Sequence, residues 1–206
     1  CDYLIIGAGV IGISIAIELS KRHSDKTIII IDKEGKEAKH ASGRNSGVLH
    51  AGFYYTEDSL KAKFTREGNA AMTTYCENNN LPIRKCGKLV VAQSNEEITV
   101  LDELLNRAKK NGVSLEKITE KEAKQIEPKV KTTKYALFSP TTSTVDPRLV
   151  VKSMAKDAIE NGVIFKFNSA YLKKKKSYIE TSSQSIKAEY VINASGLYAD
   201  KIAKDY

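Results

Sequence analysis

The sequence predicts an α/β fold, and three features near its start carry that prediction. A short apolar run at 3–6 is followed by a glycine-rich turn, Gly7-Ala8-Gly9-Val10-Ile11-Gly12, and then by apolar residues at helical spacing to about residue 21. A second apolar run at 27–31 ends at Asp32. The order strand, GxGxxG, helix, strand and acidic residue within about 30 residues is typical of a Rossmann-like βαβ unit.

Each position of the turn has a physical role. Gly7 allows the tight turn, Gly9 lets the backbone approach a pyrophosphate, and Gly12 lets the helix pack closely against the strand. Val10 and Ile11 begin the helix, whose N-terminus attracts an anion. The turn is therefore predicted to bind a dinucleotide, the alternative being an ordinary glycine-rich turn without a ligand.

Asp32 narrows the choice of dinucleotide. It falls twenty positions after Gly12, where the carboxylate accepts a hydrogen bond from a ribose 2′-hydroxyl and would repel a 2′-phosphate. We therefore expect a cofactor without that phosphate, which excludes NADP.

The remainder of the chain continues the mixture of helices and strands. We expect helices over 56–79, capped by Thr56, from a cap at Asn95 to Gly112, from the capping box that starts at Thr119, and from Asp146-Pro147 to Gly162. We expect strands in CGKLVVA, at 86–92 of the poorly alternating stretch 82–92, and over 135–138, 163–167, 170–172, 178–181 and 186–192.

Composition limits the classes of partner. The net charge is +8, with 41% hydrophobic and 28% charged residues, which is an ordinary globular composition. The lysine run 173–176 has no aromatic residues interleaved and the chain has no tryptophan, so no nucleic-acid partner is expected. The run is predicted to be a solvated hairpin tip. Peripheral membrane contact through it is left open, because stable anchoring usually takes a second signal.

The cysteines and the first apolar stretch indicate the compartment. Cys1, Cys76 and Cys86 are too few and too widely spaced for a disulfide framework or a metal site, which favours a reducing, cytoplasmic location. A position peripheral to the inner membrane is left open. The apolar stretch 4–17 follows Asp2 without a basic segment, so it does not have the pattern of a signal peptide.

Three segments together resemble a known family. IIGAGVIGISIAIEL, ASGRNSGVLHAGFYY and VINASGLYAD are similar to the FAD-dependent oxidoreductases of the D-amino-acid oxidase superfamily. Within this superfamily, the sequence most resembles the L-2-hydroxyglutarate dehydrogenase/oxidase family, because it also contains SLKAKFTREGN and CGKLVVA. The resemblance covers essentially all 206 residues and implies that they correspond to the N-terminal part of a longer fold.

The resemblance implies a Rossmann-like FAD-binding domain at 1–80 and 145–206, with an inserted, incomplete α+β substrate domain at 81–144. Tyr171 stands where the family often has a valine, so only a backbone contact with adenine carries over. Beyond the glycine turn and Asp32, the residues implied to contact FAD are Lys33, Ser42, Gly43, Arg44, Asn45, Ser46, Gly47, Tyr171, Ala194, Ser195 and Gly196.

The resemblance also implies the reaction. A 2-hydroxy acid, L-2-hydroxyglutarate first, would give its C2 hydride to the flavin and its hydroxyl proton to a base. His50 is the candidate base among these residues, and a base in the remainder of the longer fold is left open as the alternative. Tyr54 or Tyr55 would orient the substrate carboxylate. The electron acceptor stays open between oxygen and a quinone. Two alternatives remain: an amine or amino-acid oxidase, and a catalytically incompetent FAD-binding fragment that self-associates through open strand edges.

Overall fold

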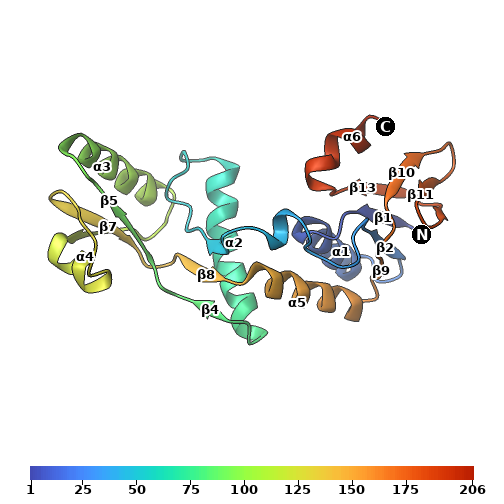
Figure 1. Ribbon diagram of the computed structural model, residues 1–206, viewed down its shortest axis with the longest axis horizontal. Helices are drawn as coiled ribbons and strands as arrows, with labels where there is room; N and C mark the ends of the chain where they lie inside the picture. Colours follow the sequence, from blue (N-terminus) through green and yellow to red (C-terminus); the bar gives the residue numbers. More distant parts are fainter. The chain divides into compact units, whose positions relative to one another are not determined.

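The computed structural model describes all residues, 1–206. The chain divides into two compact units, which Figure 1 shows in the colours of the sequence. Unit 1 consists of Cys1–Ser46 and Pro147–Tyr206, and unit 2 consists of Gly47–Asp146. The first boundary expected from the sequence lay near residue 80 instead. The structure places 47–80 in unit 2 because strands on either side of that expected boundary pair with the same partner strand.

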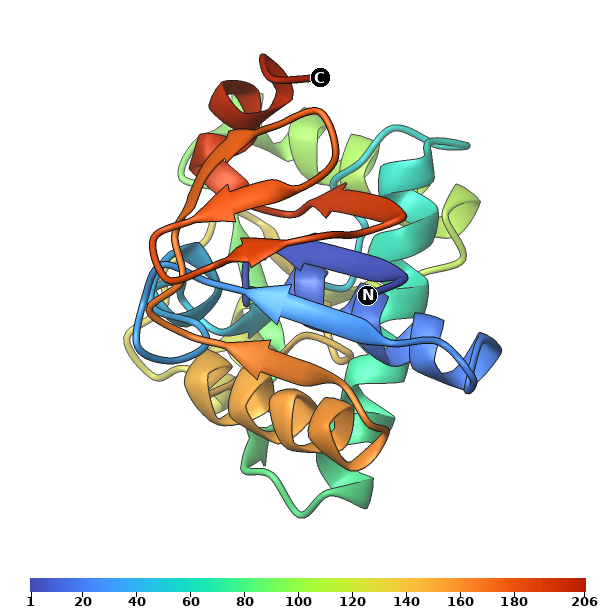
Figure 2. The ribbon, with the colours of Figure 1, turned by 90° about the vertical axis from the view of Figure 1, so that its right-hand side faces the viewer.

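Unit 1 is built on a four-stranded parallel sheet. Its order is β13-β1-β2-β9, and Figure 2 shows the four strands side by side. The strands are β1 (Tyr3–Ile6), β2 (Ile28–Ile31), β9 (Ile164–Lys166) and β13 (Tyr190–Asn193). Two helices, α1 (Val10–Arg22) and α5 (Pro147–Glu160), pack against each other. This architecture confirms the predicted α/β class.

The central strands form because their side chains are apolar on both faces. Leu4 and Ile5 of β1 and Ile30 and Ile31 of β2 are all at most 1% exposed, as expected for parallel strands covered on both sides. Ile6 is in register with both Ile31 and Asn193. The residues that follow these three strands therefore emerge at one edge of the sheet, where ligands bind in such folds.

A small antiparallel sheet completes unit 1. It contains β10 (Tyr171–Lys174), β11 (Ile179–Thr181) and β12 (Ser185–Ile186). The chain ends in a 3₁₀ turn, η2 (Gly196–Tyr198), and the short helix α6 (Ala199–Ala203). Buried residues from both sheets and from α6 share one core: Leu4, Ile6, Ile31, Ile179, Ile186 and Ile202.

Unit 2 contains two three-stranded antiparallel sheets. One has the order β3-β8-β4 and the other β5-β7-β6. The strands are β3 (Val48–Leu49), β4 (Ile83–Arg84), β5 (Lys88–Val91), β6 (Glu116–Thr119), β7 (Tyr135–Ser139) and β8 (Ser143–Val145). The helices are α2 (Leu60–Asn78), α3 (Asn95–Lys110) and α4 (Glu120–Ile126). A hydrophobic core of unit 2 includes the buried residues Phe53, Leu101, Leu104 and Leu137.

Two predicted helix caps are wrong. Helix α2 is capped by Ser59, whose Oγ accepts the Ala62 N–H at 3.1 Å, while Thr56 precedes the helix in a turn. Helix α3 is capped by Ser94 instead of Asn95. In α2 the serine lies directly before the first helical residue, whereas Thr56 lies too far away, and in α3 the predicted cap Asn95 is itself the first helical residue, so that the serine before it accepts from the first turn. The capping box at Thr119 is confirmed, with Glu122 as its second member.

The predicted strand 186–192 is two strands. β12 ends at Ile186 and β13 begins at Tyr190. Between them the chain turns to the N-terminus, where the Cys1 amino group donates to the Lys187 carbonyl and the Cys1 carbonyl accepts the Glu189 N–H. The lysine run 173–176 covers the end of β10 and the turn that follows it. No helix is long and apolar enough to span a bilayer.

Candidate functional site

The glycine turn between β1 and α1 is packed too tightly for side chains. Gly7 has φ +114°, and a Cβ there would lie 2.5 Å from the Ala194 carbonyl oxygen. A Cβ at Gly12 would overlap the Gly7 carbonyl oxygen. The Gly7 N–H donates to Ile31 at 2.8 Å, and the Ala194 N–H donates to Ile6 at 3.0 Å. These contacts hold the ends of β1, β2 and β13 together around the turn.

The N-terminus of α1 faces the segment that follows β2. Its N-cap residue is Gly9, which has no side chain to cap the helix. The Val10 N–H donates instead to Ser42 Oγ at 3.0 Å. A Cβ at Gly9 would meet only this hydroxyl, at 3.1 Å. A helix N-terminus with no bulky side chain over it fits a pyrophosphate, because the N–H groups and the helix dipole both favour an anion.

Asp32 links the glycine turn to the loop after β2. Its Oδ2 accepts the Ala8 N–H at 2.7 Å and its Oδ1 accepts the Glu34 N–H at 2.9 Å. A carboxylate offers about four acceptor positions, so these two bonds leave capacity for a ribose hydroxyl. The next residue, Lys33, places its Nζ 3.8 Å from the centre of the Tyr198 ring. The sequence analysis did not predict Tyr198 as a site residue, because its spacing matches no motif.

The segment 41–46 is braced from within. It begins with a 3₁₀ turn, η1 (Ala41–Gly43), and Asn45 Nδ2 donates to the carbonyls of Ala41 and Ser42, both at 3.1 Å. A Cβ at Gly43 would overlap the carbonyl oxygen of Ala38, which itself has φ +57°. The Ala38 N–H donates to Ala8 at 3.2 Å. The segment is therefore tied to the glycine turn directly at Ser42, and through Ala38, which precedes it. Arg44 and Ser46 are exposed.

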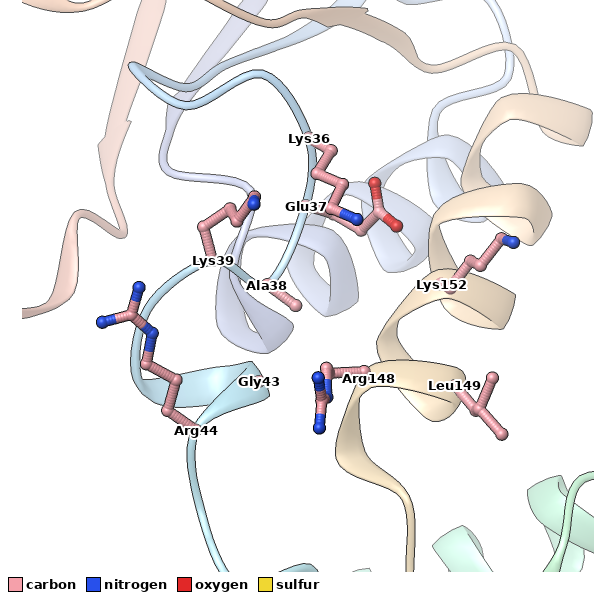
Figure 3. A pocket seen from close by; sticks show the side chains of 9 residues that line it. All are labelled: Lys36, Glu37, Ala38, Lys39, Gly43, Arg44, Arg148, Leu149 and Lys152. Carbon is pink, nitrogen blue, oxygen red and sulfur yellow. The ribbon is translucent and has the colours of Figure 1, made fainter.

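A basic hollow lies beside this segment. It has a volume of about 320 Å³, and Figure 3 shows Lys39 and Arg44 on the loop side and Arg148 and Lys152 on α5. The charged residues that line it are Lys36, Glu37, Lys39, Arg44, Arg148 and Lys152. Concave surfaces dominated by one sign of charge raise the local concentration of the opposite ion. The hollow thus gives a positive field to the part of unit 1 that carries the glycine turn.

The last group of unit 1 candidates follows β13. Ser195 Oγ donates to Asn193 Oδ1 at 2.6 Å, and Gly196 adopts φ +59°. Tyr171 lies in β10, and its hydroxyl donates to Asp205 Oδ2 at 2.7 Å. Burial, with this hydrogen bond, raises the pKa of Tyr171. Because the hydroxyl is engaged there, the expected cofactor contact of Tyr171 stays a prediction for its backbone.

The three catalytic candidates, His50, Tyr54 and Tyr55, belong to unit 2. Gly47, expected to contact the cofactor, also lies in unit 2, and its carbonyl accepts the Val145 N–H at 2.9 Å. His50 follows β3, and its carbonyl accepts from Asn69 Nδ2 at 3.3 Å. His50 is exposed, yet partial desolvation of its imidazole, and then the positive charge of Lys88, lower the pKa of the His50 imidazole below its ordinary value.

The two tyrosines differ in their surroundings. The Tyr54 ring packs on Phe53 with centroids 4.2 Å apart, and Lys88 Nζ lies 4.7 Å from its centre. Tyr55 has Lys61 Nζ 4.5 Å from its ring centre instead, and its carbonyl accepts from Asn111 Nδ2 at 2.9 Å. Lys88 thus lies beside the Tyr54 ring, and its positive charge also acts on His50. This lysine was not among the residues predicted from the sequence, although the strand CGKLVVA that contains it was.

The fold and the glycine turn define a class of protein, and comparison with known families identifies it. The FAD dependent oxidoreductase family, DAO, matches residues 2–206. The chain therefore belongs to this family of FAD-dependent oxidoreductases, and FAD is its cofactor.

Individual relatives of known function indicate which members of the family the chain resembles. The chain is 36% identical over 222 residues to the mitochondrial L-2-hydroxyglutarate dehydrogenase of Nematostella vectensis, covering 98% of this chain and 48% of the relative. It is 35% identical over 208 residues to the L-2-hydroxyglutarate dehydrogenase of Escherichia coli strain K12, covering 98% and 49%. The chain therefore spans about half the length of these relatives.

Solved structures confirm the fold. Glycine oxidase from Geobacillus kaustophilus aligns with a TM-score of 0.87 at 23% identity, covering 99% of this chain and 57% of that one. L-α-glycerophosphate oxidase from Mycoplasma pneumoniae, with FAD bound, aligns with a TM-score of 0.84 at 27% identity, covering 99% and 56%.

Proposed function

We propose that the protein oxidises a 2-hydroxy acid, L-2-hydroxyglutarate, to the corresponding 2-oxo acid. The observation that carries the proposal is that 98% of the chain aligns at 34–36% identity with L-2-hydroxyglutarate dehydrogenases of animals and bacteria. FAD, when bound, would supply the hydride acceptor. Unit 1 holds the cofactor and unit 2 contributes residues to the substrate side.

The residues of unit 1 bind and orient the cofactor. The pyrophosphate binds at the N-terminus of α1 and at the Ser42 hydroxyl. These two groups are adjacent, because the Val10 N–H donates to Ser42 Oγ at 3.0 Å. Asp32 accepts hydrogen bonds from the ribose with the acceptor positions that Ala8 and Glu34 leave. Lys33 and Tyr198, stacked as cation and ring, border the same edge of the sheet.

In unit 2, His50 takes the hydroxyl proton. A base must be neutral before it accepts a proton, and the lowered pKa of His50 keeps its imidazole neutral at pH 7. A well-placed general base contributes about 10²–10⁴ in rate. Loss of the hydroxyl proton to His50 allows the C2–H bond to break with its electron pair.

Turnover of a substrate panel tests the proposal. The FAD-loaded protein, made from its complete gene, is mixed with an artificial electron acceptor and with L-2-hydroxyglutarate, D-2-hydroxyglutarate, L-lactate, glycine or L-proline. We expect the highest kcat/KM for L-2-hydroxyglutarate. Faster oxidation of an amino acid than of any 2-hydroxy acid would replace the proposal by amino-acid oxidation, and absence of turnover with the whole panel would remove it.

A further inference from the structure

A half-buried lysine of unit 2 has no acidic partner. Lys88 opens strand β5, and the ion pairs of this unit use other lysines: Lys85 with Glu77, Lys110 with Glu57, Lys117 with Asp102 and Lys124 with Glu120. Lys88 faces the Tyr54 ring instead, with Nζ 4.7 Å from the ring centre. A cation over an aromatic face is stabilised without being neutralised, so its charge remains available to an anion.

The backbone around Lys88 is held in place. Gly87 has φ +67°, a region that L side chains rarely adopt, and a Cβ there would overlap the Phe138 ring. The Gly87 N–H donates to the Thr142 carbonyl at 3.0 Å, and Lys88 is in register with the fully buried Ser139 of β7. A residue fixed by a turn and by strand pairing loses little further freedom when it binds a ligand.

The surroundings of Lys88 combine three functions. The ammonium group attracts a negative charge. The Tyr54 ring packs on Phe53 of the core and offers an apolar face. The positive charge of Lys88 also acts on the imidazole of His50 and lowers its pKa. Asn69, which donates to the His50 carbonyl from α2, is uncharged. The charge acting on the imidazole is therefore that of Lys88. Within residues 1–206, the ion pairs of unit 2 leave Lys88 without a carboxylate.

We propose that Lys88, with the Tyr54 ring beside it, forms a subsite for a substrate carboxylate and positions the substrate hydroxyl at His50. The proposal rests on the proposed function, because it assigns the recognition of an anionic substrate within the same site. The same ammonium group has a second effect: it disfavours protonation of His50 and so keeps the base in its active form. Lys88 is a positioning residue in this scheme and takes no part in proton or hydride transfer.

The test compares Lys88→Met, Lys88→Arg and Lys85→Met in the FAD-loaded protein made from the complete gene. Lys85 lies three residues away and is an exposed lysine paired with Glu77, so Lys85→Met is the matched control. For Lys88→Met we expect KM for L-2-hydroxyglutarate to rise about 10- to 100-fold, the usual loss on removing a hydrogen bond to a charged group. Lys88→Arg should recover most of the affinity, and Lys85→Met should match the wild type.

Two further readouts separate recognition from a structural role. The acid limb of kcat/KM should move to higher pH in Lys88→Met, because loss of the positive charge raises the pKa of His50. Glutarate, a dicarboxylate with no hydroxyl to oxidise, should inhibit the wild type and bind it in calorimetry, and Lys88→Met should weaken both. An unchanged KM and an unchanged glutarate affinity in Lys88→Met would overturn the subsite.

The experiments distinguish a failure of the proposed reaction from a failure of the Lys88 subsite. A wild-type protein that binds glutarate through Lys88 but does not oxidise L-2-hydroxyglutarate would retain the subsite and refute the reaction. A protein that oxidises L-2-hydroxyglutarate equally well with Lys88→Met would retain the reaction and refute the subsite.

Discussion

Ser42 and Val10 are 32 residues apart in the chain, yet the Ser42 hydroxyl accepts the Val10 N–H at 3.0 Å. This single bond caps α1 from outside, because the N-cap residue Gly9 has no side chain to do so. It also brings the segment 41–46 onto the part of the fold that attracts phosphate. Ser42 therefore caps the helix and lies where we propose that the pyrophosphate binds.

Replacing Ser42 by alanine should weaken FAD binding. The variant loses the cap of α1, which costs about 1 kcal/mol of stability, and a hydrogen-bond donor for the cofactor. We expect the dissociation constant for FAD, measured by quenching of flavin fluorescence, to rise about 10-fold. Ser14→Ala is the control, since Ser14 lies in the same helix and its hydroxyl donates only to the Val10 carbonyl. Equal losses in both variants would contradict a specific role for Ser42.

Replacing Gly9 by valine should remove FAD while the protein stays folded. A side chain at position 9 meets only the Ser42 hydroxyl, which can move aside, but it fills the space where the backbone approaches the pyrophosphate. The flavin absorbance of the purified protein and its far-UV circular dichroism report the two effects separately. A yellow Gly9→Val protein with full FAD content would show that the pyrophosphate lies elsewhere. Gly68→Ala in α2, where a Cβ meets nothing within 4 Å, should change neither.

His50→Ala should reduce kcat by at least about 10²-fold while FAD stays bound. In the wild type, kcat/KM should fall only at acidic pH, because the base works in its neutral form and its pKa lies below the ordinary value for histidine. Activity is therefore retained above that pKa and lost as the pH falls through it. A pH profile without an acid limb, together with a near-normal kcat for His50→Ala, would assign the base to another residue.

Asn111→Ala should destabilise unit 2. The residue is 6% exposed, and its side chain donates to the carbonyls of Gly52 and Tyr55. Its own carbonyl accepts from Arg66 at 2.7 Å. Truncation leaves the two carbonyls without their donor, which costs about 1–3 kcal/mol. Denaturant unfolding measures the loss, and Asn79→Ala, an exposed residue at the end of α2, should cost far less.

The sequence predicted the fold where the local pattern and the packing agree. The buried runs of β1 and β2 and the glycine turn were identified because continuous apolar strands joined by a GxGxxG turn are characteristic of a βαβ unit. β3 and β8 were missed since strands of two or three residues show no alternation. The caps at Ser59 and Ser94 were misplaced by one to three residues because several polar residues precede each helix.

The candidate site was less predictable. The contact of Asp32 with Ala8 joins two residues of the fingerprint, so both could be named in advance, whereas Ser42, which contacts Val10, was named only through the family resemblance. Lys88 and Tyr198 could not be named in advance, because an isolated lysine or tyrosine has no characteristic spacing. Their roles depend on which ring or charge the fold places beside them.

Val48 and Thr144 are paired across β3 and β8, and the Val145 N–H donates to the Gly47 carbonyl. The two ends of the hundred residues of unit 2 are thus fastened to each other by backbone hydrogen bonds. An inserted segment whose ends meet can be lengthened, exchanged or removed with little demand on the host, because closing the gap needs only a short connection. The architecture allows one cofactor-binding scaffold to be combined with different modules for recognising substrates.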